Sequence, residues 1–319
     1  MTNPKVSVIS TNYNHGRFIK ATIESVLGQS YDNFEYIVVD GGSKDESTSI
    51  LKEYSRIKWI SERDDNSYHA FEKGLDMARG EYIMQCAVTD GYLDMDWLRK
   101  CAEALDSDKD ISLVWGLSGH MSESGDLMGA AYPQFVDSDP EQKYDYFYYW
   151  LATFFWFPEG NFCVRKEVFR KCFPKYNPGQ YVKSGEIQFD PWLEFNFNFN
   201  RLGYLPFFIR SMANFGRFHA DQKSQKEIED GAGNKVFNSY YELCRKHRKS
   251  IILGAGHTWR DSTGKVLPIQ FLRRKFILKH LLTIRFVINW LKPLARPVIK
   301  KMMQNKIAAK ILRLLKKYS

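Results

Sequence analysis

The sequence predicts an α/β fold in which a mainly parallel sheet is flanked by helices. Short apolar runs alternate, along residues 5–86, with segments whose apolar residues recur at helical spacing. Strands that alternate with helices in this way form parallel sheets. The chain has 319 residues, of which 44% are hydrophobic and 26% charged, and this composition excludes a disordered or collagen-like protein.

The first two strands are predicted over residues 5–11 and 36–40, which are short runs rich in valine and isoleucine. Between them, apolar residues over 18–27 recur at helical spacing after a polar turn. Gly-Gly-Ser at 41–43 ends the second strand, and Asp45 opens the next helix with a capping side chain.

A third strand is predicted over 57–60 and a fourth over 81–86, with a helix over 68–77 between them. The carboxyl ends of parallel strands meet at one edge of a sheet, and ligands bind outside that edge. We therefore expect the polar residues that follow the four strands to converge on one site: Asn12, Asp40, Asp64 and Asp90.

The middle of the chain contains an unusual aromatic run, with ten aromatic residues in the fourteen positions 144–157. Such a run can form core packing, a wall on which sugars stack, or a membrane-facing patch. Its density favours a partly exposed acceptor or membrane surface. Beyond it, the pattern predicts strands over 160–165 and 205–209 and helices over 166–172, 189–202 and 238–247.

Five scattered cysteines lack Cys-x-x-Cys spacing, which argues against a disulfide framework or a zinc site and fits a reducing compartment. The start of the chain has no apolar segment of signal-peptide length. A conventional spanning helix is also not expected, because no uncharged apolar stretch of about 20 residues is present.

The net charge of +9 is concentrated in residues 262–319, which hold 15 Lys or Arg and no Asp or Glu. Over 303–318, basic residues at helical spacing line one face and apolar residues line the other, as in an interfacial helix. We expect this tail to bind an anionic membrane surface; the alternative is a helix pair that packs on the body or in an oligomer. The apolar faces suit lipid better than nucleic acid, so no nucleic-acid partner is expected.

Five blocks in the first 98 residues carry a family resemblance. They are VSVISTNYN at 6–14, IESVLGQ at 23–29, EYIVVDGGSKD at 35–45, SERD with Tyr68, Ala70 and Lys73-Gly74 at 61–74, and ARGEYI at 78–83. In this order and spacing they resemble family 2 glycosyltransferases of the GT-A fold. The resemblance implies a GT-A domain over 1–225, with a donor-binding half at 1–98 and an acceptor and catalytic half at 99–225. A helical region would follow at 226–319, ending in the basic amphipathic tail.

Members of this family transfer a sugar from a nucleotide-diphosphate donor to an acceptor hydroxyl, and the resemblance implies such an enzyme here. A diphosphate leaving group needs its charge neutralised, so Mg²⁺ or Mn²⁺ is expected. Asp90 matches the family's metal-binding aspartate, and the resemblance of Arg-Phe-His at 217–219 implies that His219 is a second metal ligand or a group that bonds the diphosphate. Thr89 stands where a second acidic residue is common. The alternatives are a turn role for Asp90 and a packed structural role for His219.

The resemblance places the donor-binding residues at the strand ends. Thr11, Asn12 and Tyr13 would line the nucleotide pocket, and Asp40 would accept a hydrogen bond from uracil N3–H, so a UDP-sugar is the expected donor. The other donor-site residues expected are Asp64, Lys73, Thr89 and Arg217, the last of which would neutralise phosphate charge. Alternatively, Thr11 belongs to a capped loop, Asp40 forms an Asx turn and Lys73 lies on a solvated helix face.

Residues 185–193 resemble the segment that carries the family's general base, with Asp190 at the base position and Glu186 as the backup candidate. A single base opposite the leaving group implies inversion at the anomeric carbon. Asp190 precedes a proline, so it also fits an N-cap, and both roles can coexist. The acceptor site is expected to include Glu159, Asn161 and Trp192.

These expectations combine into an inverting glycosyltransferase on the inner, cytoplasmic face of the cell membrane. It would act on a lipid-linked or polysaccharide acceptor in cell-envelope glycan synthesis. The alternative is a catalytically impaired protein of the same fold that binds a nucleotide-sugar or a glycan, and Thr89 is the residue that leaves it open.

Overall fold

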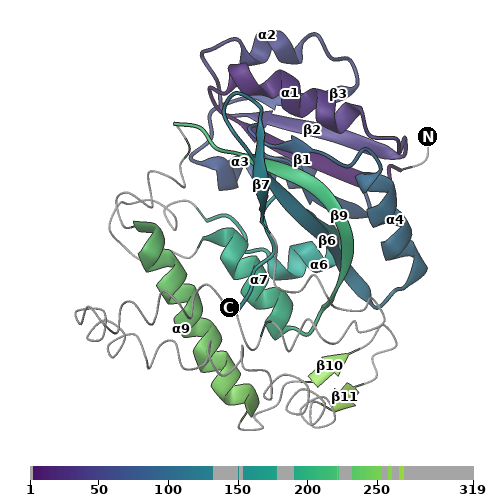
Figure 1. Cartoon of the computed structure of the whole chain (residues 1–319), viewed down its shortest axis with the longest axis vertical. Coiled ribbons are helices and arrows are strands. Elements are labelled where there is room, and N and C mark those ends of the chain that lie inside the picture. The colour runs from purple at the N-terminus through teal and green to yellow at the C-terminus, as the bar shows by residue number, and fades with distance from the viewer. Residues whose placement is uncertain are drawn as a thin grey trace, which may run out of the picture.

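The computed structural model describes residues 3–131, 150, 154–177, 190–220, 222, 232–252, 258–260 and 266–268. Within these residues, a nine-stranded sheet forms the centre of the molecule, with helices on both faces (Figure 1). A separate two-stranded sheet joins β10 (Thr258–Arg260) to β11 (Val266–Pro268).

The amino-terminal part of the sheet is parallel, as the alternation of strands and helices predicts. Its order is β3-β2-β1-β4, with bounds β1 Val6–Asn12, β2 Phe34–Asp40, β3 Ile57–Ser61 and β4 Tyr82–Gln85. Asn12 lies opposite Asp40, and Asp40 lies opposite Ser61. The carboxyl ends of these strands therefore meet at one edge of the sheet.

The second half of the sheet is mixed. β8 is antiparallel to both β4 and β6, and the long strands β6 and β9 run parallel to each other. β5 pairs with β9, and β7 pairs with β6, both antiparallel. The bounds are β5 Gly91–Tyr92, β6 Ile111–Met121, β7 Leu127–Ala131, β8 Phe162–Arg165 and β9 Leu205–Arg217. The predicted strand over 205–209 is thus the start of a much longer one.

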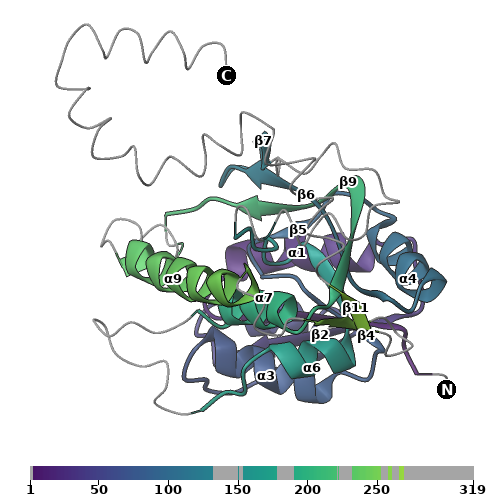
Figure 2. The same ribbon diagram turned by 90° about the horizontal axis from the view of Figure 1, so that it is seen from below.

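Two hydrophobic cores cover the two faces of the sheet. Helices α1 (Gly16–Leu27), α2 (Ser47–Leu51) and α4 (Trp97–Ser107) contribute to one core. The other core includes side chains of α3 (Ser67–Met77), α6 (Lys166–Cys172), α7 (Pro191–Arg201) and α9 (Ala232–Ile252). Figure 2 shows α1 and α4 on one side of the sheet and α3 and α6 on the other.

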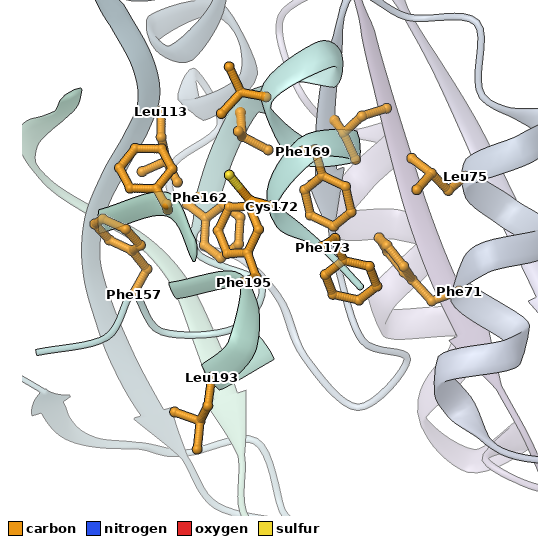
Figure 3. Packing of buried hydrophobic residues seen from close by; sticks show 14 of the residues in the cluster. Phe71, Leu75, Leu113, Phe157, Phe162, Phe169, Cys172, Phe173, Leu193 and Phe195 are labelled. Atoms are coloured by element: carbon orange, nitrogen blue, oxygen red, sulfur yellow. The ribbon is translucent and has the colours of Figure 1, made fainter. Parts of the chain in front are cut away.

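The second core is strongly aromatic. Figure 3 shows Phe169 of α6, and Phe173 directly after it, beside Phe71 of α3. In the same core, Phe162 and Phe195 are stacked at a centroid distance of 5.2 Å. Trp150, Phe154 and Phe157 are buried in the same core. The interpretation of a partly exposed surface is therefore wrong for Trp150, Phe154 and Phe157, whereas Phe155 and Trp156 are half-buried and pack against this core.

Helix α9 packs against α7 and buries Tyr240 and Cys244 in this core. Trp150 Nε1 donates a hydrogen bond of 3.3 Å to the Tyr240 hydroxyl, which joins α9 to the body across 90 positions of sequence. The boundary predicted at residue 226 stays a prediction, but the described helix beyond it shares the core. The amphipathic segment at 303–318 lies outside the described residues. None of the described helices combines the length and apolar character needed to cross a membrane.

Candidate active site

The loops that follow β1 and β2 are bound to each other by hydrogen bonds. Gly41 N donates to Asn12 O at 2.8 Å, and Asn14, in the left-handed region at φ 55°, donates its N–H to Ser43 Oγ at 2.8 Å. The Asp45 carboxylate accepts from Gly16 N at 2.8 Å, which anchors the start of α1 to the second loop. The two strand ends therefore form one rigid platform.

Asp40 is fully buried and receives four hydrogen bonds. Asn12 Nδ2 donates at 2.6 Å, Ser61 Oγ at 2.6 Å, and Ser43 donates both its N–H, at 3.0 Å, and its hydroxyl. Burial opposes ionisation, but the donors from Ser43, Ser61 and Asn12 outweigh it and hold the pKa of Asp40 below its ordinary value. A carboxylate has about four lone-pair positions, so its acceptor capacity is filled by the protein.

Next to Asp40, an exposed ring and a second carboxylate lie on either side of Gly41. A Cβ at Gly41 would lie 3.3 Å from Tyr13 Cδ2 and 3.4 Å from Asp64 Oδ2, so glycine keeps this space open. Tyr13 is 60% exposed, whereas the Asp64 side chain is 5% exposed and pairs with Lys73 Nζ at 2.5 Å.

Lys73 also pairs with Glu62 at 2.6 Å, and these carboxylates raise its pKa against the effect of desolvation. The Lys73 ammonium group therefore forms ion pairs with Asp64 and Glu62 and does not face solvent alone. Thr11, half-buried at the end of β1, lies opposite Val39.

Asp90 follows β4 and has a different environment from Asp40. Its Oδ1 accepts from Arg217 N at 3.1 Å and from the Thr89 hydroxyl at 3.3 Å. Desolvation dominates and raises the pKa of Asp90 to about 6, although these hydrogen bonds and the charge of Arg217 oppose the rise. The Thr22 hydroxyl of α1 lies 2.6 Å from the backbone oxygens of Val88 and Asp90 and fixes this turn.

Arg217 lies at the end of β9, beside Asp90. Its guanidinium donates from Nε to Thr89 O at 3.2 Å and from Nη1 to the carbonyls of Ser122 and Glu123 at 3.2 and 3.3 Å. It also lies 5.4 Å from the centroid of the Phe18 ring. The side chain is 7% exposed, and among the described residues its guanidinium has no carboxylate in ion-pair contact. A nearly buried guanidinium with no described carboxylate in ion-pair contact is costly, and an anionic ligand would stabilise it.

His219 is buried beside the first turn of α1. Its ring lies 5.1 Å from the Phe18 ring and 5.5 Å from the His15 ring. The His219 ring therefore packs against the same Phe18 ring that the Arg217 guanidinium approaches, and its role as a metal ligand stays a prediction.

The predicted metal site can be tested against these contacts. Asp90 Oδ1 is occupied by protein donors, whereas Oδ2 makes no hydrogen bond with the described residues. No three His, Cys, Asp or Glu side chains of the described residues gather into a cation site. The residues present fit a divalent cation only where a ligand supplies further oxygen atoms.

Asp190 caps α7, as its position before Pro191 predicts. Its Oδ1 accepts from Trp192 N at 2.8 Å and from Leu193 N at 3.2 Å. The N-cap interpretation is confirmed, and the role of general base stays a prediction. Glu186, the backup candidate, lies outside the described residues.

The three predicted acceptor residues lie in different environments. Glu159 is exposed, on a turn where the Cβ position of Gly160 is 3.9 Å from Asp90 Oδ2. Asn161 is fully buried and bonds only within the protein, to Gly116 N, Leu117 O and Asn214 Oδ1. Asn161 therefore stabilises the sheet in this structure and is not presented to an acceptor. Trp192 packs against the aromatic core, with its ring 4.8 Å from Phe173.

Sequence reasoning missed the residues that support this site. Ser61 enters the Asp40 cluster only through the register of β2 with β3, and Thr22 reaches the Asp90 turn only through the packing of α1. Ser43 was signalled, because it belongs to the Asp-Gly-Gly-Ser run at 40–43. Phe18 carries no signal beyond its helical spacing.

The chain matches a known family over just over half its length. The family model described as Glycosyl transferase family 2 matches residues 7–173. This segment contains β1 to β4, the Asp40 cluster and Asp90.

Curated relatives match the same part of the chain. Chondroitin synthase of Escherichia coli is 27% identical over 133 residues, which is 40% of this chain and 19% of the relative. TuaG of Bacillus subtilis, named for teichuronic acid biosynthesis, is 30% identical over 155 residues, or 46% of this chain and 58% of the relative. A PGL/p-HBAD biosynthesis glycosyltransferase of Mycobacterium bovis is 27% identical over 121 residues, or 36% and 47%. The chain thus spans less than two thirds of the length of each.

Solved structures resemble the fold over more of the chain. The crystal structure of S. aureus TarS 1–349 in complex with UDP-GlcNAc has a TM-score of 0.54 at 16% identity, covering 90% of this chain and 78% of that chain. TarS 1–349 without that ligand has a TM-score of 0.50 at 17% identity, covering 79% and 75%. At this identity the likeness concerns the fold, a GT-A-like mixed sheet flanked by helices.

Proposed function

Because this chain belongs to glycosyl transferase family 2, we propose that it transfers a sugar from a nucleotide-diphosphate donor to a hydroxyl of a cell-envelope glycan or glycolipid acceptor. The observation that carries the proposal is that Arg217 is bonded to Asp90 through its backbone N–H, while its nearly buried guanidinium has no described carboxylate in ion-pair contact. A diphosphate is the kind of anion that such a cation binds well. The relatives named for polysaccharide or glycolipid synthesis support the choice of acceptor class.

The donor base would lie against Tyr13, Gly41 and Asp64, where an exposed ring and a carboxylate flank an open glycine. Asp40 would contribute by fixing Asn12 and Ser43, because its own acceptor positions are filled. Direct acceptance from uracil N3–H by Asp40 would require one serine hydroxyl to turn away. UDP is the first donor nucleotide to test, since the fold neighbour TarS was crystallised with UDP-GlcNAc.

A divalent cation, Mg²⁺ or Mn²⁺, would be held by Asp90 Oδ2 together with phosphate oxygens of the donor, with His219 nearby. When bound, it would supply positive charge to the leaving diphosphate. Arg217 faces the same charge from the protein side, through a guanidinium held by three carbonyl oxygens. Its rigid position means that little reorganisation is needed when the charge develops.

Asp190 would take the proton of the acceptor hydroxyl, with Glu186 as the second candidate. Its carboxylate is held at the start of α7 by two N–H groups, and this fixes its direction. Attack from the side opposite the diphosphate would invert the anomeric configuration. The exposed Glu159 would border the acceptor, because its turn lies beside Asp90.

The test is transfer or hydrolysis of UDP-, GDP- and dTDP-sugars by the full chain with Mn²⁺ or Mg²⁺. We expect one donor to be consumed by the unaltered protein and to survive with Asp190→Asn. If no donor is consumed while a nucleotide-sugar still binds, the alternative of a binding protein on this fold replaces the enzyme.

We also propose that residues 262–319 hold the chain on an anionic membrane surface, because they carry 15 basic and no acidic residues. Flotation with anionic vesicles should recover the full chain and lose the form that ends at residue 268, which keeps β10 and β11. Equal recovery of both forms would contradict this role of the tail.

A further inference from the structure

The turn between β6 and β7 supports the site from outside the predicted donor and acceptor residues. The carbonyl oxygens of Ser122 and Glu123 accept hydrogen bonds from the Arg217 guanidinium. The turn therefore already contacts the cation that we propose to bind the donor diphosphate. The turn is closed by Gly125, at φ 99°, whose N–H donates to Ser122 O at 3.1 Å. These residues lie outside the five sequence blocks that carry the family resemblance.

The side chain of Glu123 makes two further contacts. Its Oε1 pairs with Nη1 of Arg17, in the first turn of α1, at 2.8 Å. Its Oε2 accepts from Ala220 N at 3.4 Å. One carboxylate therefore connects α1 with the segment that follows β9.

That segment, residues 217–220, carries both Arg217 and His219. It is fixed at its start by Arg217 N on Asp90 and by Phe218 N on Met121 O at 2.8 Å. Beyond Phe218, the hydrogen bond from Ala220 N to Glu123 joins this segment to the turn between β6 and β7. The His219 ring lies on the same first turn of α1 that Arg17 belongs to.

From these contacts we infer that Glu123 is a positioning residue, which holds Arg217 and His219 in place for the donor diphosphate by joining residues 217–220 to Arg17. The side chains of Glu123 and Arg17 are 44% and 48% exposed, so this connection is not part of either core. Its loss should disturb ligand binding more than folding, because exposed ion pairs contribute little to stability. The expected effect on donor binding rests on the proposed function, whereas the contact of Glu123 with Arg17 and Ala220 is independent of it.

The same turn offers a matched control. Asp126 accepts from Ser124 Oγ at 2.7 Å and from Ser122 Oγ at 3.4 Å, and these contacts stay within the turn. Asp126→Asn therefore changes a carboxylate of the turn without touching residues 217–220.

The experiment compares Glu123→Ala, Glu123→Gln and Asp126→Asn in the full chain by two measurements. Hydrogen exchange of peptides that cover residues 217–220 should rise about tenfold in Glu123→Ala, less in Glu123→Gln, and not in Asp126→Asn. UDP affinity in the presence of Mn²⁺ should fall by about tenfold in Glu123→Ala, by less in Glu123→Gln, and not in Asp126→Asn. The melting temperatures of all three variants should stay close to that of the unaltered chain.

Unchanged exchange in Glu123→Ala, or an equal rise in Asp126→Asn, would overturn the inference. So would raised exchange with unchanged UDP affinity, because Glu123 would then hold the segment without serving the ligand. Failure of the unaltered chain to bind any nucleotide would instead count against the proposed function, and the exchange measurement would still decide the contact.

Discussion

Asp40 and Asp90 follow strands on either side of β1, yet their carboxylates meet opposite environments. Asp40 is surrounded by four donors from short polar side chains and a backbone N–H, and its pKa is held low. Asp90 has two donors, both on one oxygen, and desolvation raises its pKa to about 6. Burial opposes the charge at both sites, but the hydrogen bonds outweigh it at Asp40, and desolvation outweighs the hydrogen bonds at Asp90.

The difference separates a carboxylate that the protein satisfies by itself from the one for which we propose a ligand. At the end of β2, the protein itself satisfies the charge, and the result is a rigid platform. After β4, Asp90 Oδ2 makes no hydrogen bond with the described residues, and the neighbouring guanidinium is bonded to carbonyl oxygens and not to a described carboxylate. A carboxylate that is incompletely satisfied in the free protein lowers stability and gains most when a cation or a phosphate-bound cation arrives.

The largest effect that tests this comparison is on turnover. Asp90→Asn keeps the shape of the side chain but removes the charge, so transfer from the preferred nucleotide-sugar should fall by about a thousandfold. Nucleotide release would be measured at saturating donor. The variant should unfold at the same denaturant concentration as the unaltered chain, or a higher one, because an incompletely satisfied carboxylate has been removed. Wild-type turnover in Asp90→Asn would remove Asp90 from the proposed mechanism.

The next effect is on stability and belongs to the other carboxylate. Asp40→Ala leaves the donors of Asn12, Ser43 and Ser61 without their acceptor in a buried site, and should cost about 3 kcal/mol of unfolding free energy. Urea unfolding of the full chain would measure it. A cost comparable to that of an exposed substitution, below about 0.5 kcal/mol, would mean that Asp40 is not the centre of the platform.

The third effect concerns the cation. Because the described residues do not gather three ligating side chains and we propose Asp90 as the metal-binding carboxylate, Mn²⁺ should bind the chain alone weakly and bind at least about tenfold more tightly when UDP supplies phosphate oxygens. Titration followed by the electron paramagnetic resonance of free Mn²⁺ measures both affinities. Equal affinity with and without UDP would contradict a site completed by the donor. Asp40→Asn is the matched control, and it should leave the gain from UDP intact if Asp40 acts only through the fold.

The first half of the fold could be predicted from sequence to within about two residues at most ends. The alternation of apolar strands with helices is strong there, and neighbouring parallel strands follow one another along the chain. β6 could not be predicted, because its partners β8 and β9 lie about 50 to 100 positions away and its later residues, from Gly116 to Met121, mix glycine, polar and apolar side chains. Pairing over such distances leaves no local periodic signal.

The site could be predicted as a location more readily than as a set of contacts. The rule that ligands bind at the carboxyl edge of parallel strands is enough to select Asn12, Asp40, Asp64 and Asp90 from the sequence. Whether protein donors occupy the hydrogen-bond acceptor positions of a carboxylate at this edge depends on strand register and side-chain packing. Ser61 reaches Asp40 across the β2–β3 pair, and Arg217 reaches Asp90 from the far end of β9. Asn161 was predicted from its sequence neighbours, whereas its side chain bonds to Gly116, Leu117 and Asn214 in the sheet, a contact that sequence alone does not show.

The smallest effect is a change of stability with pH, and it tests whether the donors around Asp40 act through its charge. The folded pKa of Asp40 lies below its unfolded value, so its contribution is complete above an unfolded pKa of about 3.9 and is lost as the pH falls through the folded pKa. Asp40→Asn cannot titrate at this position. The stability difference between the unaltered chain and Asp40→Asn should therefore be constant between about pH 7 and pH 5 and shrink below that, by at most about 1.4 kcal/mol per pH unit.

Urea unfolding of both proteins at each pH gives the difference directly, and because all other carboxylates are common to the two chains, their titration cancels. A difference that stays constant or grows toward low pH would mean that Ser43, Ser61 and Asn12 stabilise the position through hydrogen bonds that do not depend on its charge. Asp40 and Asp90 would then differ less in their electrostatics than in their packing.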